Sequence, residues 1–204
     1  MSTGMSPARR EGRYDGFVVI AAMVAIMWVV EVVDAIDDHN LDAYGIRPHH
    51  LDRLIGIVTA PFLHASWGHL VSNTVPFVVL GFAIALNGVR RVLTVTAIVM
   101  VVGGLGTWLI ASSNSIHIGA SGVVFGYATY LLFRGVFNGS AVELLIGAVV
   151  AALYGSALLG GLAPQDGISW QGHLCGGIGG LVAASMLKRA GSEKKTANAV
   201  PDGL

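Results

Sequence analysis

One serine in this chain lies in a setting that suits nucleophilic chemistry. Gly119 and Gly122 bracket Ser121, and an apolar run begins directly behind the serine. Glycines permit backbone torsions that other residues resist, and they allow another backbone to come close. A serine at a helix start also lies beside unpaired N–H groups, which can stabilise a developing negative charge. The stretch therefore predicts a hydroxyl nucleophile beside anion-stabilising donors, although an N-cap serine in a glycine-rich turn would have the same local sequence.

Three further polar side chains could complete such a site. His69 and Asn73 are four residues apart, so they share one face of a predicted helix. His173 opens another apolar stretch. A serine, a histidine base and amide or imidazole donors are the groups that acyl transfer requires. Each residue alone is equally compatible with a structural hydrogen bond, and their coincidence favours catalysis.

The composition indicates a membrane protein. Hydrophobic residues make up 54% of the 204 residues, charged residues make up 12%, and the mean hydropathy is +0.70. A globular chain usually carries about 25% charged residues. The 28 glycines are typical of membrane helices that pack closely. The single cysteine, Cys175, excludes a disulfide bond within the chain.

Six apolar runs predict an all-α membrane protein with six transmembrane helices. They are expected at residues 17–33, 68–86, 92–111, 121–137, 142–162 and 171–187. A signal peptide is the competing interpretation of the first run, but no small-residue cleavage pattern follows it. Residues 1–16 are expected to form a disordered N-terminal arm, 17–187 the membrane domain, and 188–204 a basic tail. The longest loop, 34–60, is expected to be partly helical and to lie at the membrane surface.

Basic residues predict the orientation of the six spans. Ten lysines and arginines fall on the side of the two termini, whereas Arg47 and Arg53 fall on the other side. This bias is a positive-inside signal, so both termini are expected in the cytoplasm. The four polar candidates would then lie at one depth, near the extracytoplasmic ends of their helices.

Small residues suggest how the serine and the histidine could meet. Glycines lie at helical spacing on two spans, with Gly122 and Gly126 on the fourth and Gly176, Gly177 and Gly180 on the sixth. This spacing lets two helices pack backbone to backbone. Close packing of these spans would bring His173 towards Ser121.

In this arrangement the chain resembles the rhomboid intramembrane serine proteases of bacteria. The matching segments, in order, are His64-Ala-Ser-Trp-Gly-His69-Leu-Val-Ser-Asn73, Gly119-Ala-Ser121-Gly122, and Gly172-His173-Leu-Cys-Gly176 with Gly180. Tyr44-Gly-Ile-Arg-Pro48 also looks like the loop after the first helix in many bacterial members. The resemblance covers roughly residues 40–187.

The resemblance implies a role for each candidate residue. Ser121 would be the nucleophile and His173 its general base and then general acid, without an acidic third member. His69, Asn73 and the Ser121 backbone N–H would form the oxyanion hole, and Gly119 would shape the turn. The resemblance also implies a multi-pass protein of the bacterial plasma membrane, with its active site facing outward and with transmembrane proteins as substrates.

Three positions depart from the family pattern or have an open role. His64 matches a frequent family histidine, and we do not assign it to catalysis. Ala85 occupies a region where the family often has a glutamate, which leaves the anchoring of loop 34–60 open. Phe125 occupies a place where an aromatic residue, often tyrosine, packs on the catalytic histidine.

Other interpretations have weaker support in the sequence. A catalytically inactive rhomboid-like protein that binds membrane helices is the main alternative, and the presence of both Ser121 and His173 argues against it. A channel or transporter would favour internal repeats, which are not evident. Cys175 is two residues from His173 and points to another face, so a Cys–His pair is disfavoured. His49-His50 has no carboxylates at known metal-binding spacing, so no metal is expected, and no cofactor is expected either. The basic tail is interpreted as an orientation signal or a contact with membrane lipid, and not as a nucleic-acid-binding segment.

Overall fold

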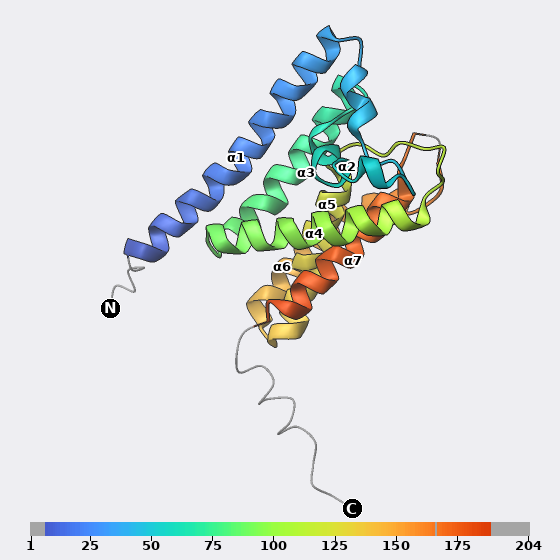
Figure 1. Cartoon of the computed structure of the whole chain (residues 1–204). Helices are drawn as coiled ribbons and strands as arrows, with labels where there is room; N and C mark the ends of the chain where they lie inside the picture. Colours follow the sequence, from blue (N-terminus) through green and yellow to red (C-terminus); the bar gives the residue numbers. More distant parts are fainter. Residues whose placement is uncertain (1–6, 166, 189–204) are drawn as a thin grey trace, which may run out of the picture.

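The computed structural model describes residues 7–165 and 167–188, which form an all-helical fold (Figure 1). The α-helices are α1 (Pro7–Ile36), α2 (Gly56–Thr59), α3 (Trp67–Ala85), α4 (Val89–Ile110), α5 (Ser121–Asn138), α6 (Ala141–Gly161) and α7 (Trp170–Met186). The 3-10 helices η1 (Asn40–Tyr44), η2 (Leu51–Arg53) and η3 (Ala60–Phe62) flank α2. Among the described residues, β-structure is restricted to two isolated bridges.

The long helices match the expected spans closely, except at the start of α1. Helices α3 to α7 begin within three residues of their predicted starts. Helix α1 begins at Pro7, so the expectation of a disordered arm is wrong for residues 7–16. Proline suits the first helical position, where its missing N–H costs no hydrogen bond, and the alanine, arginines and glutamate that follow favour helix. Residues 1–6 of the expected arm and 189–204 of the expected tail lie outside the described residues.

The chain is a membrane protein. Four helices are long and apolar enough to cross a membrane, namely α1 from Gly12 onward, α3, α4 and α6. Helix α7 has 17 residues and α5 has 18, and polar or small residues are frequent in the first turn of each, with Gln171, Gly172 and His173 following Trp170 in α7. Helix α5 packs against α3, α4, α6 and α7, and a helix enclosed by others needs less apolar surface than one facing lipid. The all-helical class is therefore confirmed, while the count of six spans stays a prediction.

Helices α5 and α7 are in direct backbone contact. A Cβ atom on Gly176 would overlap the carbonyl oxygen of Gly122, and one on Gly180 would overlap that of Gly126. Only glycine fits at both α7 positions, because the opposing atoms belong to backbone that cannot turn aside. The stripe of small residues thus sets the separation of the two helices that carry Ser121 and His173.

A buried ion pair joins the C-terminal end of α5 to the N-terminal end of α6. The Arg134 guanidinium donates to Glu143 Oε1 at 2.5 Å and to Asn87 Oδ1 at 3.1 Å. Arg134 is 6% exposed, so its charge is buried and is compensated by the contact with Glu143. Omitting Arg134 from the ten basic residues on the side of the termini leaves nine against two, and the predicted orientation is unchanged.

The loop 34–60 is partly helical, as predicted, and it is anchored without a glutamate at Ala85. Ile46 and His117 exchange backbone hydrogen bonds of 2.9 and 3.0 Å. The Thr59 hydroxyl donates to the Tyr44 carbonyl at 2.6 Å. In Figure 1 this loop lies with the C-terminal end of α1 and the loop before α5 at one end of the bundle, whereas α1 and α4 begin at the other.

Candidate active site

Ser121 and His173 are brought together at the N-terminal ends of α5 and α7. Ser121 is the first residue of α5, and Ala120 occupies the N-cap position without a side-chain bond. The Ser121 Oγ atom lies 2.8 Å from His173 Nε2, within hydrogen-bonding distance. Ser121 is therefore not an N-cap serine, and its side chain is directed to an imidazole 52 residues further along the chain.

The surroundings of His173 fix its tautomer and the plane of its ring. Nδ1 lies 2.7 Å from the Gly161 carbonyl oxygen, which can only accept, so Nδ1 carries the proton. In the neutral imidazole Nε2 is then the free acceptor that faces the Ser121 hydroxyl. The Phe125 ring stacks on the imidazole with centroids 4.1 Å apart and planes 9° apart. These contacts prepare Nε2 to take a proton from Ser121 without an acidic partner on Nδ1.

The end of α6 supports this arrangement through Gly161. A Cβ atom there would lie 2.6 Å from the Phe125 ring and 2.9 Å from His173 Nδ1. A larger residue would therefore displace either the stacked ring or the imidazole. Sequence reasoning did not identify Gly161, because its partner on α7 is 12 residues away across an irregular loop.

Gly119 lies in the turn before Ser121 and has an unusual backbone conformation. Its φ of +107° is a conformation that favours glycine. A Cβ atom at Gly119 would also lie 2.6 Å from His69 Nε2. The turn therefore allows the imidazole of α3 to approach the backbone that leads into the serine.

His69 and Asn73 line the same cavity as Ser121 and His173. This cavity has a volume of about 540 Å³. Asn73 is 5% exposed, and its Nδ2 atom donates to the His69 carbonyl at 3.0 Å within α3. All four candidate residues thus surround one space large enough for several atoms of a peptide group. Their catalytic roles stay predictions.

His64, whose role the sequence left open, lies directly behind this site. The residue is fully buried, and its Nε2 atom accepts a long hydrogen bond of 3.4 Å from the Ala120 N–H. Its ring meets the His69 ring edge-on with centroids 5.1 Å apart. Burial, and secondly the nearby His69, lower the pKa of His64 to about 4, so the ring is neutral at neutral pH. His64 therefore supports the backbone before Ser121 as a neutral acceptor.

His117 is a positioning residue that sequence reasoning missed. Its Nδ1 atom lies 2.7 Å from the Ser169 hydroxyl and its Nε2 atom 2.8 Å from the Ser115 hydroxyl. Ser169 also caps α7 by accepting from the Gly172 N–H at 3.1 Å. Burial lowers the pKa of His117. The contact between His117 and Ser169 joins the loop before α5 to the start of α7. The only signal in the sequence was the position of His117, two residues before Gly119.

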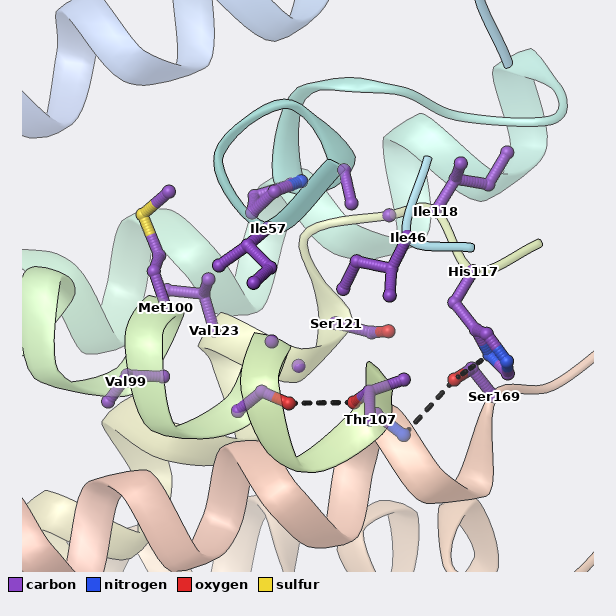
Figure 2. Close-up of a pocket in the computed structure, with 17 residues that line it drawn as sticks. Ile46, Ile57, Val99, Met100, Thr107, His117, Ile118, Ser121, Val123 and Ser169 are labelled. Atoms are coloured by element: carbon purple, nitrogen blue, oxygen red, sulfur yellow. Dashed lines mark hydrogen bonds between the residues drawn. The ribbon is translucent and has the colours of Figure 1, made fainter. Parts of the chain in front are cut away.

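A smaller cavity of about 50 Å³ lies beside Ser121, where α4 faces α2 and η3. Figure 2 shows Ser121 in its middle, with Ile57 and Met100 on one side and His117 and Ser169 on the other. Cys175 lies away from both cavities, against Gly106 of α4, as expected for a packing residue. Both cavities thus adjoin Ser121, whereas Cys175 lines neither of them.

Comparisons with known proteins indicate the family of this chain. The family model described as Rhomboid domain matches residues 51–190. An uncharacterized protein of Mycobacterium tuberculosis is 45% identical over 180 residues, which cover 84% of this chain and 75% of that protein. An uncharacterized protein of Mycobacterium leprae is 46% identical over 189 residues, 89% of this chain and 74% of that protein. A Bacillus subtilis protein, whose name marks it provisionally as a rhomboid protease, is 29% identical over 175 residues, 80% of this chain and 83% of that protein.

Proposed function

The chain belongs to the rhomboid family, and from this premise we propose that it is a serine endopeptidase acting within the membrane. It cleaves peptide bonds in or near the transmembrane segments of other membrane proteins. The observation that carries the proposal is the 2.8 Å contact between Ser121 Oγ and His173 Nε2, with Nδ1 held by the Gly161 carbonyl. A serine and a histidine so arranged form a nucleophile and its general base.

The reaction follows from the positions of these two side chains. Ser121 Oγ attacks the carbonyl carbon of the scissile bond while His173 Nε2 takes the hydroxyl proton. The imidazolium then gives this proton to the departing amine, and the C–N bond breaks to leave an acyl-enzyme. Water, deprotonated by His173, attacks the ester and releases Ser121.

The oxyanion of each tetrahedral intermediate is stabilised by hydrogen-bond donors that line the cavity. These are the His69 imidazole, the Asn73 amide and the Ser121 backbone N–H at the start of α5. Asn73 donates to its own helix in the free protein, and catalytic hydrogen bonds often tighten only in the transition state. Such donors contribute most when they are aimed at charge that develops during the reaction.

The proposed placement has six spans, both termini in the cytoplasm and the active site facing outward from a bacterial plasma membrane. It rests on the charge bias described above and on the positions of the two short helices. At about 1.5 Å per residue, the 17 residues of α7 span about 26 Å, slightly less than a hydrocarbon core of about 30 Å. Its polar start is therefore expected near the outer interface, where water for hydrolysis is available.

Substrates are expected to approach from the lipid, between α3 and α6. A side cavity of about 170 Å³ reaches Ser121 there. It is lined by Asn73 and Pro76 of α3 and by Tyr154 and Leu158 of α6. An apolar helix could unwind into this space and present a peptide bond to the serine. Transmembrane proteins are the expected partners, and nucleic acid is not.

A cleavage assay tests the proposal. The purified protein in detergent or liposomes is incubated with a single-pass transmembrane test substrate, and fragments are identified by mass spectrometry. The wild-type protein should cleave, whereas Ser121→Ala and His173→Ala should not. Ser185→Ala, a serine that bonds within α7 to the Val182 carbonyl, should cleave like the wild type. Substrate binding without cleavage by the wild type would support an inactive rhomboid-like protein instead.

A further inference from the structure

Two carboxylates are fully buried near the end of α1, away from the active site. Glu31 and Asp34 are three residues apart and therefore share one face of the helix. A buried carboxylate is costly unless a positive charge or hydrogen-bond donors compensate for the lost water. Glu31 and Asp34 therefore require hydrogen-bond donors or a positive charge nearby.

The structure supplies few partners for them. Neither carboxylate oxygen of Glu31 forms a hydrogen bond with any residue that the structure describes. Asp34 Oδ1 accepts from the Leu41 N–H at 2.8 Å, which fixes the orientation of the group. Its Oδ2 atom accepts no hydrogen bond from the described residues and lies 3.5 Å from His39 Nδ1. One oxygen of Asp34 is thus held in place while the other is left for a further partner.

The turn after α1 brings two more potential ligands to the same point. Asp38 and His39 have φ values of 49° and 59°, so the chain reverses sharply after the helix. As a result, ligand atoms of Asp34, His39 and Asp42 all lie within 4.8 Å of one another. Glu31 is close enough to interact electrostatically with each of these three residues. Asp42 Oδ1 is also buried without a hydrogen bond to the described residues.

The charges in this cluster are unbalanced. Three carboxylates surround one imidazole, and among the described residues no lysine or arginine forms an ion pair with any of them. A cation at this point would offset both the repulsion between the carboxylates and the cost of burying them.

We propose that Asp34, His39 and Asp42 bind a divalent metal ion, with the buried Glu31 carboxylate as a nearby negative charge that favours the cation. Imidazole suits zinc and other transition metals, whereas magnesium and calcium prefer sites made of oxygen ligands alone. Mixed carboxylate and imidazole ligands therefore favour Mn²⁺ or Zn²⁺. The metal would tie the end of α1 to η1, in the loop whose Ile46 pairs with His117 beside the active site.

The site could not be seen in the sequence, and the proposal departs from the expectation of no metal. The ligands belong to no known spacing motif, and the histidine pair considered there, His49-His50, lies elsewhere in the loop. The cluster depends on the left-handed turn at Asp38 and His39, which neither residue type signals strongly.

Binding to the full-length protein in detergent tests the proposal. The protein is stripped with a chelator and titrated calorimetrically with Mn²⁺, Zn²⁺ and Ca²⁺, and melting is followed with and without metal. We expect one saturable site for Mn²⁺ or Zn²⁺ and a higher Tm on binding. Asp34→Asn should weaken binding at least about 10-fold, because even outer-shell partners of a metal contribute 10- to 100-fold. The Ser121→Ala protein should bind the metal unchanged.

Asp52→Asn is the matched control, because Asp52 is an acidic residue of the same loop whose side chain is 74% exposed. His39→Ala is a second test variant that disturbs folding less than Asp34→Asn, because the His39 side chain is 43% exposed. Absence of a saturable site in the wild type would overturn the proposal. So would equal affinity in the His39→Ala protein, equal weakening by Asp52→Asn, or a preference for Ca²⁺ over both transition metals.

Discussion

At the scale of single residues, the candidate site depends on which nitrogen of each histidine carries the proton. His173 is fixed by the Gly161 carbonyl on Nδ1, so Nε2 accepts from Ser121. His64 accepts from the Ala120 N–H through Nε2, so its proton lies on Nδ1. Both imidazoles are thus neutral acceptors towards the segment that carries Ser121. Protonation of either would remove an acceptor that this segment requires.

Replacing Asn73 should lower turnover more than substrate binding. Removing an oxyanion donor costs about 10²- to 10³-fold in kcat in a soluble serine protease. Because His69 and the Ser121 N–H would still be present, we expect a loss at or below the lower end of this range. Steady-state kinetics of Asn73→Ala should show a reduced kcat and a similar KM, with Asn114→Ala, an exposed loop position, as control. An increase in KM at unchanged kcat would make Asn73 a substrate-binding residue.

His64 should make the protein less stable in acid. Its pKa is about 4 in the folded protein and about 6.5 in the unfolded chain, so the unfolded state binds more protons between these values. The free energy of unfolding should therefore decrease as the pH falls from about 6.5 to about 4, by on the order of 3 kcal/mol. The decrease should be smaller in His64→Gln, measured by unfolding in detergent at several pH values. Identical pH profiles for the two proteins would contradict this account of His64.

At the scale of helices, the glycine contact between α5 and α7 sets the distance between Ser121 and His173. Gly176→Ala should separate the helices, because its Cβ atom would overlap the Gly122 carbonyl oxygen. We expect a lower Tm, from about 1–3 kcal/mol of overpacking, and a large loss of proteolysis.

Gly177→Ala is the control on the same helix. Its Cβ atom would meet the Thr129 hydroxyl at 3.3 Å, a side-chain contact that can adjust by a few tenths of an ångström. Melting temperatures and cleavage rates of the two variants are compared with the wild type. Full activity of Gly176→Ala would show that the close contact is not what pairs Ser121 with His173.

Sequence periodicity predicted the helices well, and local chemistry explains where it failed. The ends of α3 and of α5 to α7 lie at polar or glycine-rich turns, and such turns can be recognised in a single sequence. The extra turns of α1 were missed because Arg9, Arg10 and Arg13 were interpreted as part of a disordered arm, although arginine is also a good helix former. Arg134 was interpreted as an orientation signal because its partner Glu143 lies on the next helix.

The candidate site was predictable in its residues but not in its supports. Ser121, His69, Asn73 and His173 could be identified because residue type, spacing and depth coincide. The contacts that orient them, such as His117 with Ser169, join loops 52 residues apart and have no periodic signature. The same applies to the cluster at Asp34, which depends on an irregular turn.

At the scale of the whole molecule, the side cavity between α3 and α6 predicts that large substrates and small reagents reach Ser121 differently. Ala157 of α6 lines this cavity. Ala157→Trp should fill this side cavity and slow cleavage of a transmembrane substrate. Labelling by a small serine reagent should be preserved, because the cavity lined by His69 and His173 also reaches Ser121. Val149→Trp, at a half-exposed position of α6 outside the cavity, should leave both rates unchanged. Equal loss of both rates in Ala157→Trp would indicate a distorted site and contradict a lateral route.

The central claim, that His173 activates Ser121, is tested most directly by mapping covalent labelling. The full-length protein is treated with a fluorophosphonate, and the modified residue is located by mass spectrometry while the labelling rate is measured for the wild type and for His173→Ala. We predict modification at Ser121 and a rate at least about 100-fold lower without the imidazole, because general-base assistance contributes about 10²- to 10⁴-fold. Modification of a different serine, or an equal rate in His173→Ala, would contradict the account.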